Sequence, residues 1–219
     1  MVEIYDAHEQ GEVVKKWLQE NGSAIVMGLL IAFGGLFGFN QWQAWQSSNK
    51  QQAFAEFEAL KELLIAGQLD AAVANFQVLQ DKHADSPYAS MAALQMGRAR
   101  MEAQQPDLAV LNYRFAMEHG RPKAFRLIAR ERLARALLSQ GAAAEALEIL
   151  TGETEIAGFE TRYAETRGDI LVELGRKEEA ISSYQDALDT LEAGAGDRAG
   201  LVLKLEALGV TQAGEAPAS

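Results

Sequence analysis

The 219-residue sequence contains no cysteine and only four prolines. Without cysteine the chain has no disulfide, no thiolate nucleophile and no cysteine-ligated zinc or iron–sulfur site. The scarcity of proline leaves room for long helices, and the abundant alanine, leucine, glutamate and glutamine favour helix. Outside one apolar segment near the start, valine and isoleucine do not gather into strand-like runs. These features predict an all-α protein.

Basic residues are also scarce, with 20 lysines and arginines against 31 acids and a net charge of −11. A chain this acidic repels the phosphates of nucleic acids unless it carries a basic patch. The densest basic stretch, Arg121 to Arg135, holds six bases and one acid. It lies in a helical pattern, which spreads its charges around a solvated helix. We therefore expect no nucleic-acid partner.

Residues that would indicate catalysis or cofactor binding are few. The three histidines, His8, His83 and His119, show neither i, i+4 spacing nor an HExxH motif, so no metal site is expected. There is no phosphate-binding loop and no GxSxG elbow. Gly194–Ala199 imitates a dinucleotide fingerprint, but no strand precedes it. We expect no catalytic residue, cofactor or metal; a membrane-anchored enzyme, the alternative, would need polar groups converging in a pocket.

One long stretch, between Glu20 and Lys50, has no charged residue. Its apolar centre, Ala24–Phe39, and its tolerable flanks give a predicted transmembrane helix at residues 23–42, long enough to cross a ~30 Å hydrocarbon core. The alternatives are a buried core helix and a cleaved signal peptide, but no clear cleavage site follows. All three tryptophans flank the segment as predicted interfacial anchors: Trp17, Trp42 and Trp45.

The orientation of this segment depends on a small bias in basic residues. Lys15 and Lys16 lie close before it, whereas Lys50 is the nearest base after it. The positive-inside rule then predicts that residues 1–22 are cytoplasmic and that the C-terminal part lies outside the cytoplasm. In a Gram-negative cell this places the C-terminal part in the periplasm, attached to the inner membrane.

Small residues gather on one side of the predicted membrane helix. Spacings of three and four residues let another helix approach closely, although glycine is also simply frequent in membrane helices. The predicted helix-packing face consists of Ala24, Gly28, Ala32, Gly35, Gly34 and Gly38. With no glycine or proline between Gly38 and Gly67, we expect one helix from Ser23 to Ala66, with a bend near Ser47–Ser48.

A repeated pattern follows. Four segments align, at Gly67–Phe76, Gln104–Tyr113, Gly141–Leu150 and Gly175–Tyr184, and each has an alanine five positions after its start. The alanines are 37, 37 and 34 residues apart, and a period near 34 is typical of tetratricopeptide repeats. The alanines and the large residues four positions later are Ala72 and Phe76, Ala109 and Tyr113, Ala146 and Leu150, and Ala180 and Tyr184.

Further small residues support the same pattern. Such repeats usually carry one on the first helix, twelve positions before the alanine, where Gly97, Ala134 and Gly168 stand but the first repeat has Leu60. Two more alanines, Ala116 and Ala187, follow their repeat's alanine by seven positions. We expect the small residues to let paired helices cross closely, and the large ones to fill the space between neighbouring pairs.

The predicted architecture is therefore a single N-terminal transmembrane helix followed by a tetratricopeptide-like α-solenoid at residues 43–210. Ala193–Gly200 reads as a linker, Leu201–Leu208 as a short helix closing the last repeat, and 211–219 as a disordered tail. A non-repetitive helical bundle with accidental alanine spacing is the alternative.

Several motifs resemble those of a known family. They are Glu3-Ile4-Tyr5, Val13-Val14-Lys15, Glu20-Asn21-Gly22, Trp42, Tyr88-Ala89, Arg132-Leu133-Ala134-Arg135 and Arg167-Gly168. The chain resembles the YfgM family of ancillary subunits of the SecYEG translocon. This resemblance implies an inner-membrane protein with periplasmic repeats, in contact with the translocon, a PpiD-type periplasmic chaperone and translocating polypeptides. It implies no catalytic residues. A different tetratricopeptide adaptor, in envelope assembly or signalling, is the alternative.

Overall fold

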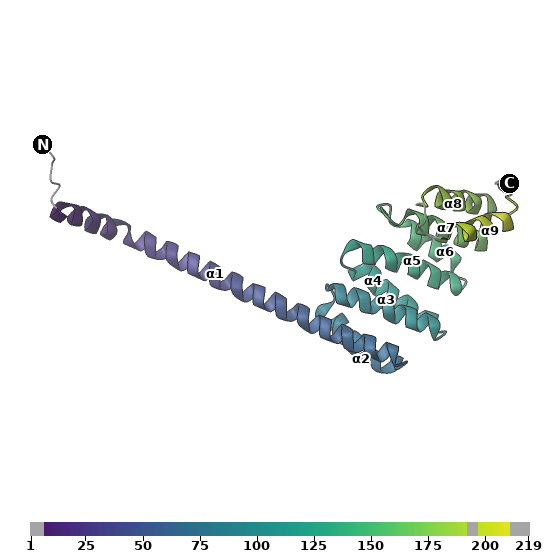
Figure 1. Ribbon diagram of the computed structural model, residues 1–219, viewed down its shortest axis with the longest axis horizontal. Helices are drawn as coiled ribbons and strands as arrows, with labels where there is room; N and C mark the ends of the chain where they lie inside the picture. The colour runs from purple at the N-terminus through teal and green to yellow at the C-terminus, as the bar shows by residue number, and fades with distance from the viewer. Residues whose placement is uncertain (1–6, 192–196, 211–219) are drawn as a thin grey trace, which may run out of the picture. The chain divides into compact units, whose positions relative to one another are not determined.

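The computed structural model describes residues 7–191 and 197–210, and within these ranges the chain forms nine α-helices and no strand (Figure 1). The predicted all-α fold is thus confirmed. Glu3-Ile4-Tyr5, residues 193–196 of the expected linker and the tail 211–219 lie outside the described residues. The helices are α1 (Ala7–Ile65), α2 (Leu69–His83), α3 (Pro87–Glu102), α4 (Pro106–His119), α5 (Lys123–Ser139), α6 (Ala143–Thr151), α7 (Glu160–Glu173), α8 (Lys177–Asp189) and α9 (Arg198–Ala207).

The chain divides into two units, Met1–Gln51 and Gln52–Ser219, with the boundary inside α1. Within α1, the helices Gly11–Ala24 and Val26–Ile65 meet at a bend of 45°. The predicted bend near Ser47–Ser48 is wrong, because these serines lie inside Val26–Ile65, which forms one arm of the bent pair, and the bend lies between Ala24 and Val26. Serine lowers helix propensity only slightly, whereas a glycine–serine pair is a common site of a kink. Such a pair, Gly22-Ser23, directly precedes the observed bend.

Every first helix of a pair ends in the same turn. After α1, the Gly67 amide donates to Leu64 O and the Gln68 amide to Leu63 O, which is a Schellman motif. Gly67 has φ of +71°, a conformation that glycine adopts without strain. In the second repeat, which lacks this glycine, Gln104 takes φ of +58° and forms the same turn. The turn is therefore common to all four repeats, including the second one, which has no glycine at this position.

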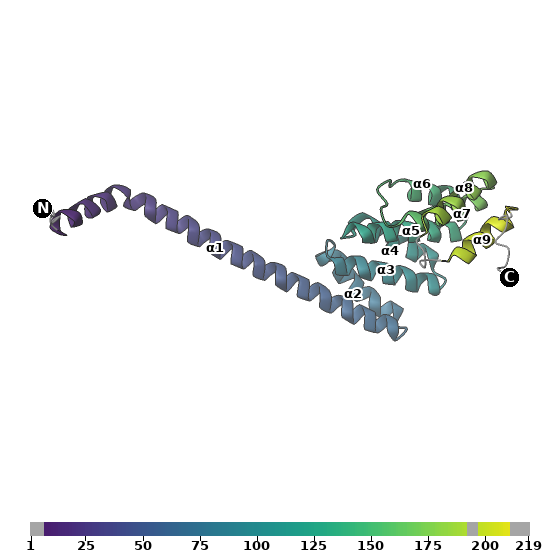
Figure 2. The same ribbon diagram turned by 45° about the horizontal axis from the view of Figure 1, so that its top comes forward.

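The second unit is a stack of helix pairs in two layers (Figure 2). Its first helices are residues 52–65 of α1, then α3, α5 and α7; its second helices are α2, α4, α6 and α8. Each of α4 and α6 packs on the first helix before it and the first helix after it. In addition, α3 contacts α5 and α5 contacts α7. These direct contacts bring the first helices close together, as expected for the concave layer of a solenoid.

The C-terminal helix starts earlier than the sequence indicates. Residues 198–200, expected to belong to a linker, form the first turn of α9. The Asp197 side chain caps this helix, because its Oδ1 accepts a hydrogen bond of 2.8 Å from the Gly200 amide. The buried face of α9, Leu201 and Leu205, packs into the same apolar cluster as α7 and α8. The helix therefore closes the stack.

Candidate protein-interaction surface

The positions expected to pack the repeats lie in the interior of the second unit. The four aligned alanines, together with Ala116, Ala134 and Ala187, have no exposed surface, and the four large residues are at most 4% exposed. In the second repeat, a Cβ added to Gly97 would lie 2.4 Å from Cε1 of Tyr113. In the fourth, a Cβ on Gly168 would lie 2.4 Å from Cε1 of Tyr184. Each tyrosine ring thus packs directly on the glycine backbone, where a Cβ would leave it no room.

These contacts correct one expectation about the large residues. The ring of Tyr113 lies on Gly97 of its own pair, so it fills space inside the pair rather than only between pairs. The Tyr113 hydroxyl also interacts electrostatically with Arg132 of the next pair. Burial raises the pKa of Tyr113, while Arg132 of α5 opposes that rise. In the third repeat the same two positions hold Ala134 and Leu150, and both are buried. Alanine is larger than the glycine of the second and fourth repeats, and leucine is smaller than their tyrosine, so the two changes compensate in volume.

A buried carboxylate that the sequence did not reveal joins α5 to α7. Glu131 is 4% exposed, forms an ion pair with Arg135 one turn later, and accepts a hydrogen bond of 3.3 Å from Thr166 Oγ1. Burial alone would lower the pKa of Arg135, but the charge and hydrogen bond of Glu131 outweigh it and the pKa is raised. In the sequence, only the arginine four positions after Glu131 indicated that this carboxylate has a partner. The group is satisfied by its neighbours, so it stabilises the stack.

A second polar cluster fastens α9 to α7. Lys204 Nζ lies 2.7 Å from Glu165 Oε1 and 2.7 Å from Asp169 Oδ1, and the Tyr184 hydroxyl donates to that same Asp169 oxygen at 2.8 Å. Burial lowers the pKa of Lys204, but the hydrogen bonds to Asp169 and Glu165 prevail and raise it. Burial also raises the pKa of Tyr184. Sequence reasoning missed this cluster because its members are far apart along the chain.

The exposed side of the first helices carries a row of apolar side chains, here called the first-helix face. Phe54, Met91 and Ile128 stand in the same position of successive repeats, six residues before Leu60, Gly97 and Ala134. Phe54 is exposed, whereas Met91 and Ile128 are partly exposed and also pack against the core. Phe54 is 47% exposed and its ring centroid lies 5.4 Å from that of Tyr88. Such a row suits apolar contact with another chain.

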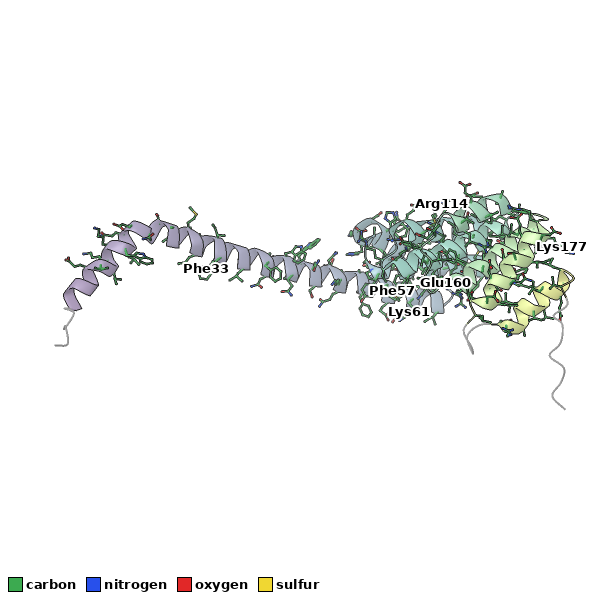
Figure 3. The ribbon with its side chains drawn as sticks, turned by 90° about the horizontal axis from the view of Figure 1, so that it is seen from above. Phe33, Phe57, Lys61, Arg114, Glu160 and Lys177 are labelled. Carbon is green, nitrogen blue, oxygen red and sulfur yellow. The ribbon has the colours of Figure 1, made fainter. Side chains whose placement is uncertain are left out.

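Ion pairs flank this row. Lys61, Arg98 and Arg135 also occupy equivalent positions, and each pairs with an acid on its own helix, namely Glu58, Glu102 and Glu131. Figure 3 shows Lys61 near Phe57, and Lys61 Nζ is 6.0 Å from the centroid of that ring. Both partners in the pairs of Lys61 and Arg98 are at least partly exposed, whereas Glu131 is buried. The first-helix face is therefore an apolar row accompanied by two solvent-accessible ion pairs, and apolar area with a charged rim is found at protein-binding surfaces.

The basic stretch from Arg121 to Arg135 is largely paired within the chain. Arg121 pairs with Asp85, and Lys123 with Glu153 and Glu155. Arg130 donates to the Ile149 carbonyl at 2.7 Å. The hydrogen bond to Glu155 raises the pKa of Lys123. These bases hold neighbouring elements together instead of forming one free cationic patch.

Polar residues do gather in one cavity of about 370 Å³ between α6, α7 and α8. Its lining includes Glu160, labelled in Figure 3, together with Tyr163 and Arg167. Arg167 is bound by Ser183 Oγ at 2.9 Å and Asp186 at 2.7 Å, and the Tyr163 hydroxyl donates to the Leu127 carbonyl at 2.9 Å. Tyr163 and Arg167 are therefore engaged in joining helices.

Histidine and acid side chains do not assemble into a metal site among the residues that the structure describes. His83 is buried and its Nδ1 has no hydrogen-bond partner, whereas the His119 ring lies 4.8 Å from that of Phe115. His119 itself is exposed to solvent.

The first unit presents apolar side chains of a different kind. From Val26 to Phe39 its large hydrophobic residues are exposed on all sides of the helix, for example Leu30 at 63% and Phe33, labelled in Figure 3, at 67%. No single helix within the described ranges meets a length and hydropathy test for a membrane span, but the bent pair Gly11–Ala24 and Val26–Ile65 meets it together.

The residues of the predicted helix-packing face are open in the structure. Ala24 and Ala32 are exposed, and a Cβ added to Gly28, Gly34, Gly35 or Gly38 would meet nothing within 4 Å. The three tryptophans are 52–62% exposed. Both sets remain predictions about contacts outside this chain.

Known proteins resemble the chain along most of its length. Residues 15–210 match the tetratricopeptide repeat-like domain family. The ancillary SecYEG translocon subunit of Aggregatibacter actinomycetemcomitans is 31% identical over 193 residues, covering 86% of this chain and 93% of that protein. The protein of the same name from Haemophilus influenzae is 28% identical over 185 residues, covering 84% and 90%.

A solved structure supports the fold alone. The crystal structure of MamA protein aligns with a TM-score of 0.52 at 16% identity, covering 85% of this chain and 100% of that one. With repeats, fold and relatives in agreement, the chain belongs to the tetratricopeptide repeat-like family and, within it, to the family of ancillary SecYEG translocon subunits.

Proposed function

We propose that this protein is a non-enzymatic, membrane-anchored adaptor at the SecYEG translocon of the inner membrane. Its N-terminus is cytoplasmic, its repeats are periplasmic, and it helps to pass translocated chains to periplasmic folding factors, including a PpiD-type chaperone. The observation that carries the proposal is the combination, in one member of this family, of a helix that is apolar on all sides and a self-contained repeat stack.

The exposed apolar helix supports the anchor. Burial of a large side chain such as Leu30 or Phe37 stabilises by about 1.5–3 kcal/mol, and in water this gain would be lost at every such position. A lipid environment recovers it around the whole circumference. The open glycines then offer a face where a neighbouring membrane helix, such as one of the translocon, can approach.

The first-helix face supports the adaptor role. Its apolar row of Phe54, Met91 and Ile128 provides contact area for segments of another chain, and methionine adapts to varied partners. The polar groups nearby are paired with one another, which favours binding over catalysis. The same face would equally serve a tetratricopeptide adaptor in envelope assembly or signalling, so partner identification separates the two functions.

Co-purification tests the proposal. Tagged full-length protein is isolated from membranes in mild detergent, beside a variant with Gly28→Leu and Gly35→Leu on the packing face. The matched control carries Val26→Leu and Phe37→Leu on the opposite side of the helix. We expect translocon subunits with the wild type and the control, and severalfold less with the packing-face variant. Absence of translocon subunits from the wild-type sample would refute the function, and recovery of other envelope proteins instead would favour the alternative.

A further inference from the structure

The helix before the bend differs in kind from the helix after it. In Gly11–Ala24 the exposed large apolar residues are Val13, Val14, Trp17 and Leu18, at 54–70% exposure. At about 100° per residue these four lie within an arc of about 140°. The charged residues of the segment, Glu12, Lys15, Lys16 and Glu20, occupy the opposite side. The helix is therefore amphipathic.

Beyond the bend the apolar surface covers the whole circumference. Leu29, Leu30 and Ile31 are consecutive and 51–69% exposed, and no charged residue interrupts the helix before Lys50. One-sided exposure suits the boundary between water and lipid, whereas all-round exposure suits the hydrocarbon core. The change falls between Ala24 and Val26, where the helix axis also turns by 45°.

We propose that Gly11–Ala24 is an interfacial helix, which lies in the headgroup region of the membrane with Val13, Val14, Trp17 and Leu18 toward the acyl chains. This inference rests on the anchor in the proposed function and adds a second mode of lipid contact to it. The occupant of the apolar face is the lipid surface itself, because the same helix continues directly into the predicted span and Asn21 is the one polar residue in the apolar arc.

The geometry agrees with this placement. A spanning helix tilts by about 20° on average; if this tilt adds to the 45° bend, the preceding helix lies about 65° from the bilayer normal. Fourteen residues are about 21 Å long, so the two ends differ in depth by about 9 Å. Amphipathic helices are buried about 5–10 Å into the interface, which accommodates that difference.

Two side chains fit the same environment. Trp17 lies within the apolar arc, and tryptophan prefers the interface. Asn21, the polar residue within that arc, donates from Nδ2 to the Trp17 carbonyl at 3.0 Å, so its amide is partly satisfied by its own helix. With two acids and two bases in the segment, binding depends on apolar area more than on lipid charge. An anchored interfacial helix would fix the rotation of the span and thereby the direction of its glycine face.

Because the chain has no cysteine, single cysteines can be placed freely for the test. Full-length protein carrying Val14→Cys, Leu18→Cys, Lys15→Cys or Gln19→Cys is labelled with an environment-sensitive fluorophore and reconstituted into phosphatidylcholine vesicles. We expect quenching by a lipid-attached spin label to be severalfold stronger at positions 14 and 18 than at 15 and 19. Adding phosphatidylglycerol should change this ratio little.

Two control positions separate this proposal from the anchor itself. Leu30→Cys should be quenched by a spin label deep in the bilayer, and Gln185→Cys in α8 should not. Equal quenching at positions 14, 15, 18 and 19, with Leu30→Cys still quenched, would overturn the interfacial helix and leave the anchor intact. Positions 14 and 18 shielded from both lipid and aqueous quenchers would mean that protein covers the face, which also overturns it. Loss of quenching at position 30 would refute the anchor.

Discussion

Glycines inside helices have opposite surroundings in the two units of this protein. In the first unit, a Cβ on Gly28 or Gly34 would meet nothing within 4 Å, whereas in the second unit a Cβ on Gly97 or Gly168 would strike a tyrosine ring at 2.4 Å. Large apolar residues differ in the same way, because Leu30 is 63% exposed and Leu133 is fully buried. The second unit buries two apolar clusters between its helices and exposes only scattered large apolar residues. The first unit leaves its large apolar side chains exposed along one helix.

The largest expected effect is on membrane integration, and it should distinguish two leucines that are about equally exposed. Leu30 is 63% exposed in the first unit and Leu203 is 64% exposed in α9. Leu30→Arg places a charge in the predicted bilayer centre and should cost about 2.5–3.5 kcal/mol of insertion free energy, which lowers the equilibrium constant for insertion about a hundredfold and with it the membrane-integrated fraction. Leu203→Arg should leave that fraction unchanged. Carbonate extraction of membranes measures both, and equal behaviour of the two variants would contradict the comparison.

A smaller effect should distinguish the glycines. Gly97→Ala forces the Tyr113 ring to move and should lower the free energy of unfolding of the repeats by about 1–3 kcal/mol, although alanine is the better helix former. Gly34→Ala should have no such effect on the repeats. Thermal unfolding of the detergent-solubilised full chain measures this difference.

The third repeat supplies the control for that substitution. It combines Ala134 with Leu150, so Gly97→Ala with Tyr113→Leu should be less destabilised than the sum of its single changes. Strict additivity would show that the ring and the glycine do not interact as described.

The closing helix should make the repeats sensitive to alkaline pH. The pKa of Lys204 is raised above its ordinary value of 10.5 in the folded state, and burial raises the pKa of Tyr184 above 10.0. Groups with raised folded pKa values contribute stability that is complete below the unfolded pKa and is lost as pH rises toward the folded one. Stability should thus fall above about pH 10.

Removing the lysine tests this cluster. Lys204→Met leaves Glu165 and Asp169 facing each other without their cation and should cost about 1–2 kcal/mol at neutral pH. Its disadvantage relative to the wild type should shrink above pH 10, as measured by thermal unfolding across pH. A constant difference from pH 7 to 11 would show that Lys204 contributes through packing alone.

The smallest effect is expected for the exposed pair that joins α4 to α6. Arg114 Nη2 lies 3.1 Å from Glu145 Oε1, with side chains 38% and 49% exposed. A double-mutant cycle with alanine at both positions should give a coupling of about 0.2–1 kcal/mol that weakens in high salt. A larger, salt-independent coupling would mean that this surface pair is more than a solvated contact.

Local patterns predicted the helices of this protein better than the contacts between them. The spacing of Ala72, Ala109, Ala146 and Ala180 indicated the repeats because helical packing requires small residues at fixed intervals. It could not show that the Tyr113 ring rests on Gly97, since that contact depends on how two helices cross. The bend follows Gly22-Ser23 rather than Ser47–Ser48, because a glycine beside serine weakens a helix more than two serines do. Helix α9 begins inside the glycine- and alanine-rich stretch, because Asp197 caps it there.

The candidate interaction surface shows the same contrast between features that follow from local patterns and contacts that do not. Exposure of Phe54, Met91 and Ile128 on a common face follows from the repeat period once the stack is known. The clusters around Glu131 and Lys204 join residues at least 35 positions apart, and no local signal predicts such pairs. The apolar helix of the first unit could be predicted from the sequence alone, because its large side chains are exposed and need no partner from elsewhere in the chain.

The topology of the full chain tests the central claim most directly. Gln185→Cys in α8 and Gln19→Cys before the span are each exposed to a membrane-impermeant maleimide in intact spheroplasts and again after permeabilisation. The account predicts that Gln185→Cys is labelled in intact spheroplasts and that Gln19→Cys is labelled only after permeabilisation. Labelling of Gln185→Cys only after permeabilisation would place the repeats in the cytoplasm and contradict a role with translocated chains.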